Sequence, residues 1–131
     1  PWLFTPKQLA AFTHGDLVPV TNAVDAVWQN RPLPSEAPAK IHPLAFAGVS
    51  SAHKRKLIAK VVREKKADYV LLTAPDSICW LLNIRGNDVE HTPLLLSYAL
   101  MDVKGRVTLF CDPLKISLDV KRHLGREITV T

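Results

Sequence analysis

The stretch LLNIRGNDVEHTP places a cluster of polar side chains between two apolar segments. Arg85 carries a planar guanidinium with five N–H donors, which suits a carboxylate. Gly86 lets the backbone turn tightly, and Asn87 and Asp88 can order such a turn through bonds to nearby backbone groups. His91 changes its charge near neutral pH. These residue types at this spacing are typical of a recognition loop.

A structural interpretation fits the same residues. In it, Arg85 pairs with Asp88 or Glu90, Asn87 forms a turn, and His91 hydrogen-bonds a carbonyl. Loops are polar by default because they run over the protein surface. The sequence therefore leaves recognition and structural support open as roles for this loop.

Other kinds of site find little support. Asp88, Glu90 and His91 are all potential metal ligands, but ligands this close together rarely converge on one ion without a further ligand from elsewhere. The serines lack a Gly-x-Ser-x-Gly elbow, the glycines do not form a phosphate-binding loop, and Cys79 lies in an apolar segment without an activating base. The sequence shows no complete catalytic constellation.

The elements that position this loop begin near residue 50. Ser50 or Ser51 is predicted to cap a helix whose Lys and Arg residues face solvent. Its packed stripe is predicted to consist of Leu57, Ile58, Val61 and Val62. ADYVLLTA follows as a strand that its continuous apolar run predicts to be buried on both faces. Pro75 then opens a short helix over DSICWLLN.

The elements after the loop complete an α/β pattern. LLLSYALM and RVTLFCD predict a β-hairpin whose turn is bounded by Asp102 and Gly105. PLKISLDVKRHLG predicts a last amphipathic helix that ends at Gly125, and REITV predicts a strand. The inward residues of that helix are predicted to be Leu114, Leu118 and Leu124. This order favours a mixed β-sheet flanked by helices.

The N-terminal third differs in composition. Short helices are predicted after Thr5 and Asn22, which are N-cap residue types. RPLPSEAPAKIHP then holds four of the ten prolines, which predicts an extended and stiff linker. We expect residues 1–45 to be the tail of a preceding domain plus this proline-rich extension, and residues 46–131 to be the α/β domain.

Composition sets the class of protein. The chain has 131 residues, 47% hydrophobic and 22% charged, which is typical of a soluble globular protein. No apolar run approaches the length that spans a bilayer, so we expect a cytoplasmic protein. Cys79 and Cys111 are predicted to be free thiols in apolar surroundings. The chain begins without Met and stops on a predicted strand, so we expect it to be a piece of a larger protein.

The net charge of +5 comes mainly from one segment. KRKLIAKVVREKK, from Lys54 to Lys66, contains seven basic residues and one acidic residue. It has no aromatic residues interleaved for base stacking, so a solvated helix face is the favoured interpretation and nucleic acid is an unlikely partner.

Two stretches resemble a known family. DSICWLLNIRGNDVEHTPLLLSYAL, followed by GRVTLFCDP, is similar to the non-catalytic middle domain of the long, cytosolic-type Xaa-Pro aminopeptidases (aminopeptidase P) of the creatinase and prolidase superfamily. The upstream residues from LVPVTNAVDAVWQN onward resemble the segment that joins the first domain to the second in those enzymes. The likeness covers nearly the whole chain.

The resemblance implies a three-domain enzyme that removes the first residue from peptides with proline in second position. A separate C-terminal domain would hold two divalent metal ions, usually manganese, so no catalytic residue and no metal ligand is expected in this chain. The implied partners are that catalytic domain, a second copy in a homodimer, and the peptide substrate. The implied candidates for the rim of the substrate site are Arg85, Asn87, Asp88 and His91.

A second hypothesis comes from the charge pattern. In it, the chain is a stand-alone α/β binding module that uses the basic helix from Lys54 to Lys66 to hold an acidic partner or nucleic acid.

Overall fold

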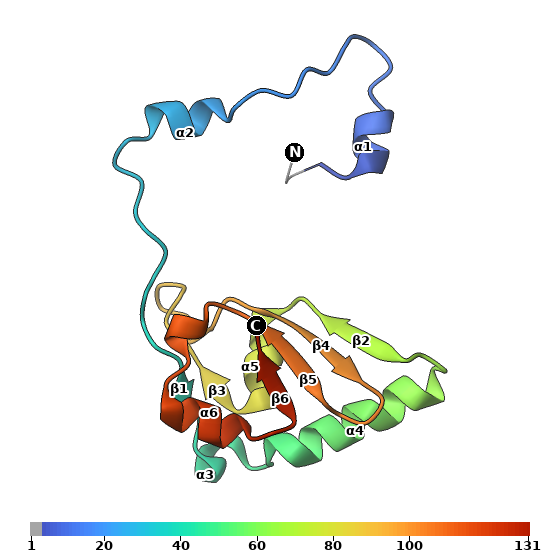
Figure 1. The fold of residues 1–131 in the computed structure, drawn as a ribbon, viewed down its shortest axis with the longest axis vertical. Coiled ribbons are helices and arrows are strands. Elements are labelled where there is room, and N and C mark those ends of the chain that lie inside the picture. The colour runs from blue at the N-terminus through green and yellow to red at the C-terminus, as the bar shows by residue number, and fades with distance from the viewer. Residues whose placement is uncertain (1–3) are drawn as a thin grey trace. The chain divides into compact units, whose positions relative to one another are not determined.

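The computed structural model describes residues 4–131, which fall into two units that divide between Leu33 and Pro34. None of the helices in this described range is long and apolar enough to cross a membrane. Figure 1 shows the helices and strands of both units.

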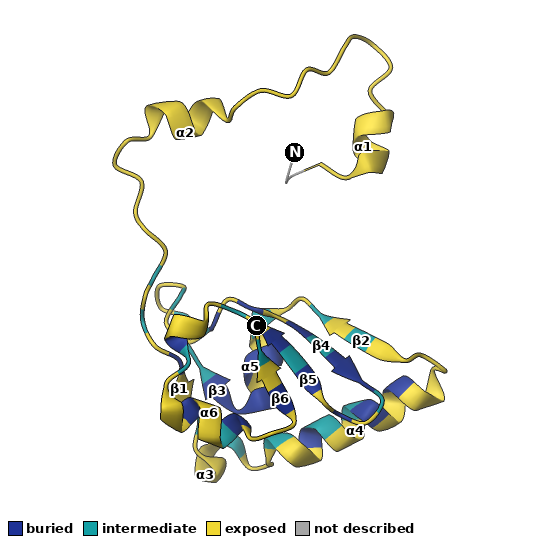
Figure 2. Cartoon of the chain, in the orientation of Figure 1, coloured by how far each residue is buried: buried dark blue, intermediate teal, exposed yellow. Residues whose placement is uncertain are grey.

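The first unit contains two short helices, α1 (Pro6–Ala10) and α2 (Ala23–Val27). Thr5 caps α1 in a capping box with Gln8, and Asn22 caps α2 by accepting a hydrogen bond from the Val24 backbone N–H. Both caps confirm the predicted helix starts. Every described residue of this unit is exposed (Figure 2), so the unit has no core of its own.

The second unit is built on a four-stranded sheet in the order β2-β4-β5-β6. Its strands are β2 (Tyr69–Leu72), β4 (Tyr98–Asp102), β5 (Val107–Phe110) and β6 (Ile128–Val130). The pairs β2–β4 and β4–β5 are antiparallel, whereas β5–β6 is parallel. The sheet is therefore mixed, which confirms the predicted fold class, and β4–β5 is the predicted hairpin.

A smaller sheet pairs β1 (Lys40–Ile41) with β3 (Ile84–Arg85) in antiparallel register. The remaining helices are α3 (Leu44–Ala47), α4 (Ser51–Glu64), α5 (Pro75–Leu82), the 3₁₀ turn η1 (Pro113–Lys115) and α6 (Leu118–Leu124). Ser50 supplies the N-cap of α4, Pro75 opens α5, and Gly125 follows α6, all as predicted.

The core lies between one face of the four-stranded sheet and the helices. Ala99, Met101 and Leu109 point to this face and are fully buried together with Ile78 and Leu82 of α5. Figure 2 shows the buried residues gathered in the strands and on the inward sides of the helices.

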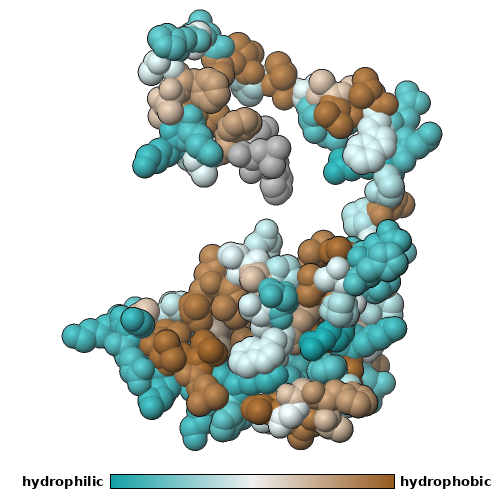
Figure 3. Space-filling view, turned by 180° about the vertical axis from the view of Figure 1, so that it is seen from behind, coloured by the Kyte–Doolittle hydropathy of each residue, from teal (hydrophilic) through white to brown (hydrophobic). Residues whose placement is uncertain are grey.

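The predicted packed stripe of α4 is wrong in part. Val62 is buried and Ile58 is half-buried, but Leu57 is 50% exposed and Val61 is similarly open. The helix instead turns Lys54 inward, because this ammonium finds polar partners at the end of α5. Figure 3 shows hydrophobic and charged side chains intermixed on one face of this unit.

The predicted last helix is also wrong in part. Pro113 opens a separate 3₁₀ turn, and α6 begins only at Leu118, with Ser117 as its N-cap. Because the two pieces do not share one helical face, Leu114 and Leu118 are exposed and only Leu124 is buried. The prediction that β2 is buried on both faces is wrong as well, since its residues alternate between exposed and half-buried.

The compact α/β unit begins at Pro34, earlier than the boundary near residue 45 that the proline pattern predicts. Ala39 is buried in the core, and its backbone N–H donates to the Lys115 carbonyl over 2.9 Å. The last part of the proline-rich segment therefore packs as part of the unit.

Candidate functional site

The polar loop connects β3 to the run of leucines before β4, and backbone bonds close its base. The Gly86 N–H donates to the Pro93 carbonyl over 3.4 Å, and the Asp88 N–H donates to the Leu94 carbonyl over 3.1 Å. A Cβ at Gly86 would lie 2.6 Å from the Leu95 nitrogen, closer than real Cβ atoms come to backbone. Glycine is therefore needed here because two backbone segments touch.

Asp88 fixes the loop to the η1 turn. One carboxylate oxygen lies 2.6 Å from the Lys115 ammonium, and the other accepts the Leu96 N–H over 2.8 Å. The Asp88 side chain is only 1% exposed. Because both oxygens have partners, this buried charge is compensated and the loop is held in one place.

The tip of the loop faces solvent. The His91 side chain is 90% exposed, and its Nε2 lies 3.4 Å from a carboxylate oxygen of Glu90. His91 adopts a left-handed backbone with φ of 58°, which is uncommon for residues with a side chain. Asn87 is exposed, and its backbone carbonyl accepts the Ser35 hydroxyl over 3.1 Å. The structure thus presents Asn87 and His91 outward and encloses Asp88.

Arg85 lies at the base of the loop and is half-buried. Its Nη1 donates to the Ile84 carbonyl over 2.8 Å and to the Cys79 carbonyl over 3.3 Å. Among residues 4–131, it forms no ion pair with Asp88 or Glu90, so the ion pair that the structural interpretation gives Arg85 is not formed and its bonds go to backbone carbonyls instead.

Three basic side chains from three elements converge on the C-terminal turn of α5. The Lys54 ammonium donates to the Trp80 carbonyl over 2.9 Å, Arg85 donates to the Cys79 carbonyl, and His123 Nε2 lies 3.0 Å from the Leu82 carbonyl. The Cys79 and Trp80 carbonyls also accept the backbone N–H of Asn83 at the end of the helix, and the helix dipole favours positive charge there. The cluster therefore completes the end of α5.

Lys54 and Asn83 are residues that the sequence analysis did not single out. Lys54 also donates to the Asn83 side-chain oxygen over 2.7 Å and lies 4.5 Å from the centre of the Trp80 ring. Asn83 has a left-handed backbone, which is typical of the residue that ends a helix, so its place after an apolar helix was a usable signal. Burial, and then the charge of Arg85, lowers the pKa of Lys54.

His42 lies near the same cations. Its backbone N–H donates to the Asn83 carbonyl over 2.8 Å. Burial lowers the pKa of the His42 imidazole, and the charges of Arg85 and Lys54 lower it further. Burial and, after it, the two cations thus both favour the neutral form of the imidazole.

The site does not fit a metal ion or a nucleophile. Both oxygens of Asp88 are already engaged, and no group of three His, Cys, Asp or Glu side chains among residues 4–131 is arranged to hold a metal. Burial raises the pKa of the Cys79 thiol, so it stays protonated, and burial raises that of Cys111 to about 11. Both cysteines are free, as predicted. What the arrangement can do is recognition by a firmly anchored loop.

The class of protein follows from comparison with known families. Residues 30–131 match the creatinase/prolidase N-terminal domain family. The mixed sheet with its helices is the fold that the resemblance implied. The chain belongs to this family.

The named relatives are aminopeptidases. The chain is 36% identical to a probable Xaa-Pro aminopeptidase P of Aspergillus niger, over 83% of this chain and 18% of that protein. It is 32% identical to aminopeptidase P2 of Arabidopsis thaliana, over 95% of this chain and 19% of that protein. The chain thus spans about a fifth of the length of these relatives.

A solved structure is also similar. It is X-prolyl aminopeptidase from Caenorhabditis elegans, described as a cytosolic enzyme with a di-nuclear active site. The TM-score is 0.77 at 27% identity, and the match covers 83% of this chain and 18% of that one. This chain therefore corresponds to one N-terminal domain of such enzymes.

Proposed function

We propose that this chain is the non-catalytic domain of a metal-dependent Xaa-Pro aminopeptidase that removes the first residue from peptides with proline in second position. The observation that carries the proposal is the family match over residues 30–131 together with relatives named for this activity. In this proposal the enzyme acts in the cytoplasm as a homodimer, and the present domain supports that assembly.

The metal ions would be held outside these residues. The resemblance points to two divalent ions, usually manganese, and the related nematode enzyme is described as having a di-nuclear active site. The Asp88 carboxylate is not free to bind them, because it is enclosed by Lys115 and the Leu96 amide. When bound elsewhere in the enzyme, such ions would polarise the scissile carbonyl and activate water.

The polar loop is the part of this domain that we propose to reach the rim of the substrate site. Binding residues are often carried on loops that a rigid scaffold positions. Here Asp88 supplies the anchor, so that Asn87 and His91 are presented in a fixed arrangement. Arg85 stands behind them with donors beyond those already used by Nη1.

The alternative function, binding of nucleic acid or an acidic partner through the basic helix, loses much of its basis. Lys54 is buried, and Arg55 and Arg63 donate to the Gly105 and Val103 carbonyls of the β4–β5 turn. Lys60 lies 3.8 Å from Glu64. Three of the seven basic side chains from Lys54 to Lys66 thus bind backbone carbonyls of the fold.

The test is hydrolysis of a short peptide with proline in second position, with manganese added, by this chain and by the complete protein that contains it. We expect activity only in the complete protein, and none on a matched peptide with alanine in second position. Arg85→Ala in the complete protein tests the loop. Unchanged kcat and KM in that variant would remove the proposed rim role, and absence of proline-dependent cleavage would overturn the proposed function.

A further inference from the structure

The outward face of the four-stranded sheet carries large hydrophobic side chains. Residues paired across adjacent strands point to the same face, so the pairs Leu71–Leu100 and Tyr98–Phe110 lie on this side. Its large residues are Tyr69, Leu71, Tyr98, Leu100 and Phe110. Among the strand residues, the one charged group on this side is Asp102 at the hairpin turn, and Arg106 neutralises it.

This face is open in the described chain. Leu71 is 61% exposed and Tyr98 is 58% exposed. In Figure 1, α5 lies behind β5 and β6, and no helix of the second unit lies in front of β4 and β5. A sheet face that is meant for water normally carries polar residues at every second position. Here Leu71, Tyr98, Leu100 and Phe110 take such positions, and Thr108 and Thr129 are the polar residues beside them.

Two hollows lie beside the large hydrophobic side chains of this sheet face. One, of about 280 Å³, is apolar and is lined by Pro75, Leu96, Tyr98 and Phe110 among others. The other, of about 290 Å³, is lined by the charged groups Asp102, Arg106, Arg126 and Glu127 among others. A hydrophobic centre with charged groups toward one side is the usual composition of a protein interface.

We infer that this sheet face is the surface on which the metal-binding catalytic domain of the longer enzyme packs, an inference that rests on the function proposed above. Relatives are about five times longer than the matched stretch, so in them this domain stands among others. Thr131 is hydrogen-bonded to Leu109 and Cys111, so a domain that follows it would be tethered to the sheet. The chain enters the unit at β1, which packs with α6 on the helical side.

Accessibility of the face is measured with cysteine variants. Leu71→Cys places a thiol on the sheet face, and Leu57→Cys places one at a comparably exposed position on α4. We expect alkylation at position 71 of the complete protein to be at least about tenfold slower than at position 57, because interface cores exclude water and reagents. In the 131-residue chain the two rates should be similar. Equal rates in the complete protein would overturn the inference.

The occupant is identified with a photoreactive residue. Tyr98→p-benzoylphenylalanine in the complete protein should cross-link, on irradiation, to peptides of the metal-binding domain. Cross-links to residues before Pro34, or a covalent dimer between two copies, would overturn the assignment. The Xaa-Pro peptidase assay on the same preparation tests the proposed function separately. Cross-links to the C-terminal region without peptide cleavage would contradict the proposed activity but would still support the docking surface.

Discussion

Gly86 lies where the backbone of the loop leaves no space for a side chain. An added Cβ would meet the backbone of Leu94 and Leu95, and backbone atoms cannot rotate aside as a side chain can. We expect Gly86→Ala to lower the free energy of unfolding by about 1–3 kcal/mol, the usual cost of overpacking. Urea unfolding measures it, with the exposed Ser77→Ala on α5 as control. Equal midpoints for the two variants would contradict the close approach.

Asp102 is expected to make the free energy of unfolding depend on pH in the acidic range. Burial alone would raise the pKa of this carboxyl, but hydrogen bonds from the Arg106 and Lys104 N–H groups and the Arg106 side chain hold the pKa below its usual value. Because the pKa of Asp102 is lower in the folded state than in the unfolded state, its carboxylate stabilises the folded chain. This stabilisation is fully present above the unfolded-state pKa of about 4 and is lost as pH falls through the folded-state pKa.

Asp102→Asn should therefore cost about 1–3 kcal/mol near neutral pH, and the difference from the unchanged chain should shrink below about pH 4. Unfolding in urea at several pH values measures this. Asp119→Asn is the control, because Asp119 pairs with Arg122 at the surface and such pairs contribute little. A difference that stays constant down to pH 2 would rule out the carboxylate as its cause.

At the scale of elements, the Asp88–Lys115 pair joins the loop to the η1 turn. Lys115→Met leaves the Asp88 carboxylate buried without a cation, and breaking such pairs typically costs about 3–5 kcal/mol. We expect the Leu96 amide, which Asp88 holds, to exchange its hydrogen faster in this variant.

The control is Lys121→Met, which removes an exposed lysine from α6. A second comparison combines Asp88→Asn with Lys115→Met, which removes both charges and should recover part of the lost stability. If Lys115→Met matched the Lys121 control in unfolding and exchange, the loop would not depend on this pair.

Elements with strong local signals were predictable. The caps Ser50 and Asn22, the helix-opening Pro75 and the turn between Asp102 and Gly105 all act through neighbouring residues, and all appear where the sequence predicts. The Asp88–Lys115 pair links residues 27 positions apart, and β1–β3 pairs residues more than 40 apart. Periodicity carries no information about such long-range partners.

The errors have a common physical cause. Hydrophobic spacing predicts which face of an element is apolar, but not whether a partner covers that face. Leu71 on β2 and Leu57 on α4 are exposed for this reason. Lys54 is the opposite case, because a basic residue that would normally face water finds two acceptors inside, the Trp80 carbonyl and the Asn83 side-chain oxygen.

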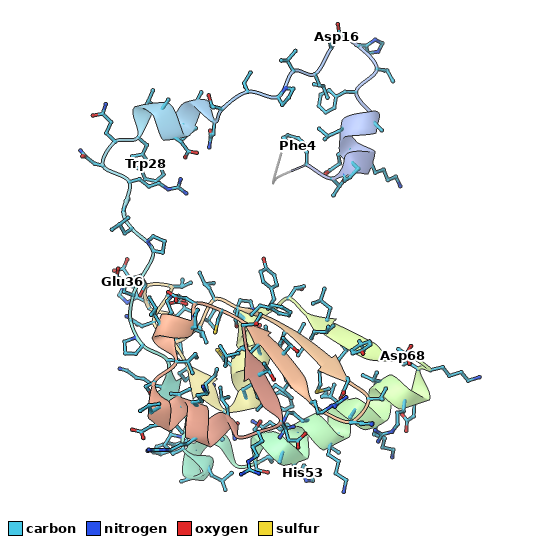
Figure 4. All side chains as sticks on the ribbon, in the orientation of Figure 1. Phe4, Asp16, Trp28, Glu36, His53 and Asp68 are labelled. Carbon is cyan, nitrogen blue, oxygen red and sulfur yellow. The ribbon has the colours of Figure 1, made fainter. Side chains whose placement is uncertain are left out.

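At the scale of the whole molecule, the basic residues of α4 join separate parts of the second unit. Lys54 connects this helix to the end of α5, whereas Arg55 and Arg63 connect it to the β4–β5 turn. Figure 4 helps to locate α4, with His53 near its start and Asp68 just beyond its end. Three of the seven basic side chains from Lys54 to Lys66 thus bind backbone carbonyls of other elements and help to assemble the fold.

Two truncations locate the start of the folded unit. Residues 4–33 include no buried position, so a chain that begins at Pro34 should unfold with a free energy within about 0.5 kcal/mol of the whole chain. A chain that begins at Phe46 also loses β1, the buried Ala39 and the hydrogen bond from Ala39 to Lys115. It should be less stable by about 2 kcal/mol or more, because each lost internal hydrogen bond contributes about 1 kcal/mol.

Urea unfolding of the two truncated chains decides between the boundaries. Equal stabilities would mean that residues 34–45 only trail from the domain, as their prolines suggest, and would place its start near residue 46. A loss confined to the shorter chain would mean that β1 is part of the domain. In that case Ser35, whose hydroxyl donates to the Asn87 carbonyl, and Ala39 brace the polar loop from outside the segment that contains it. Any experiment on that loop then has to retain the chain from Pro34 onward.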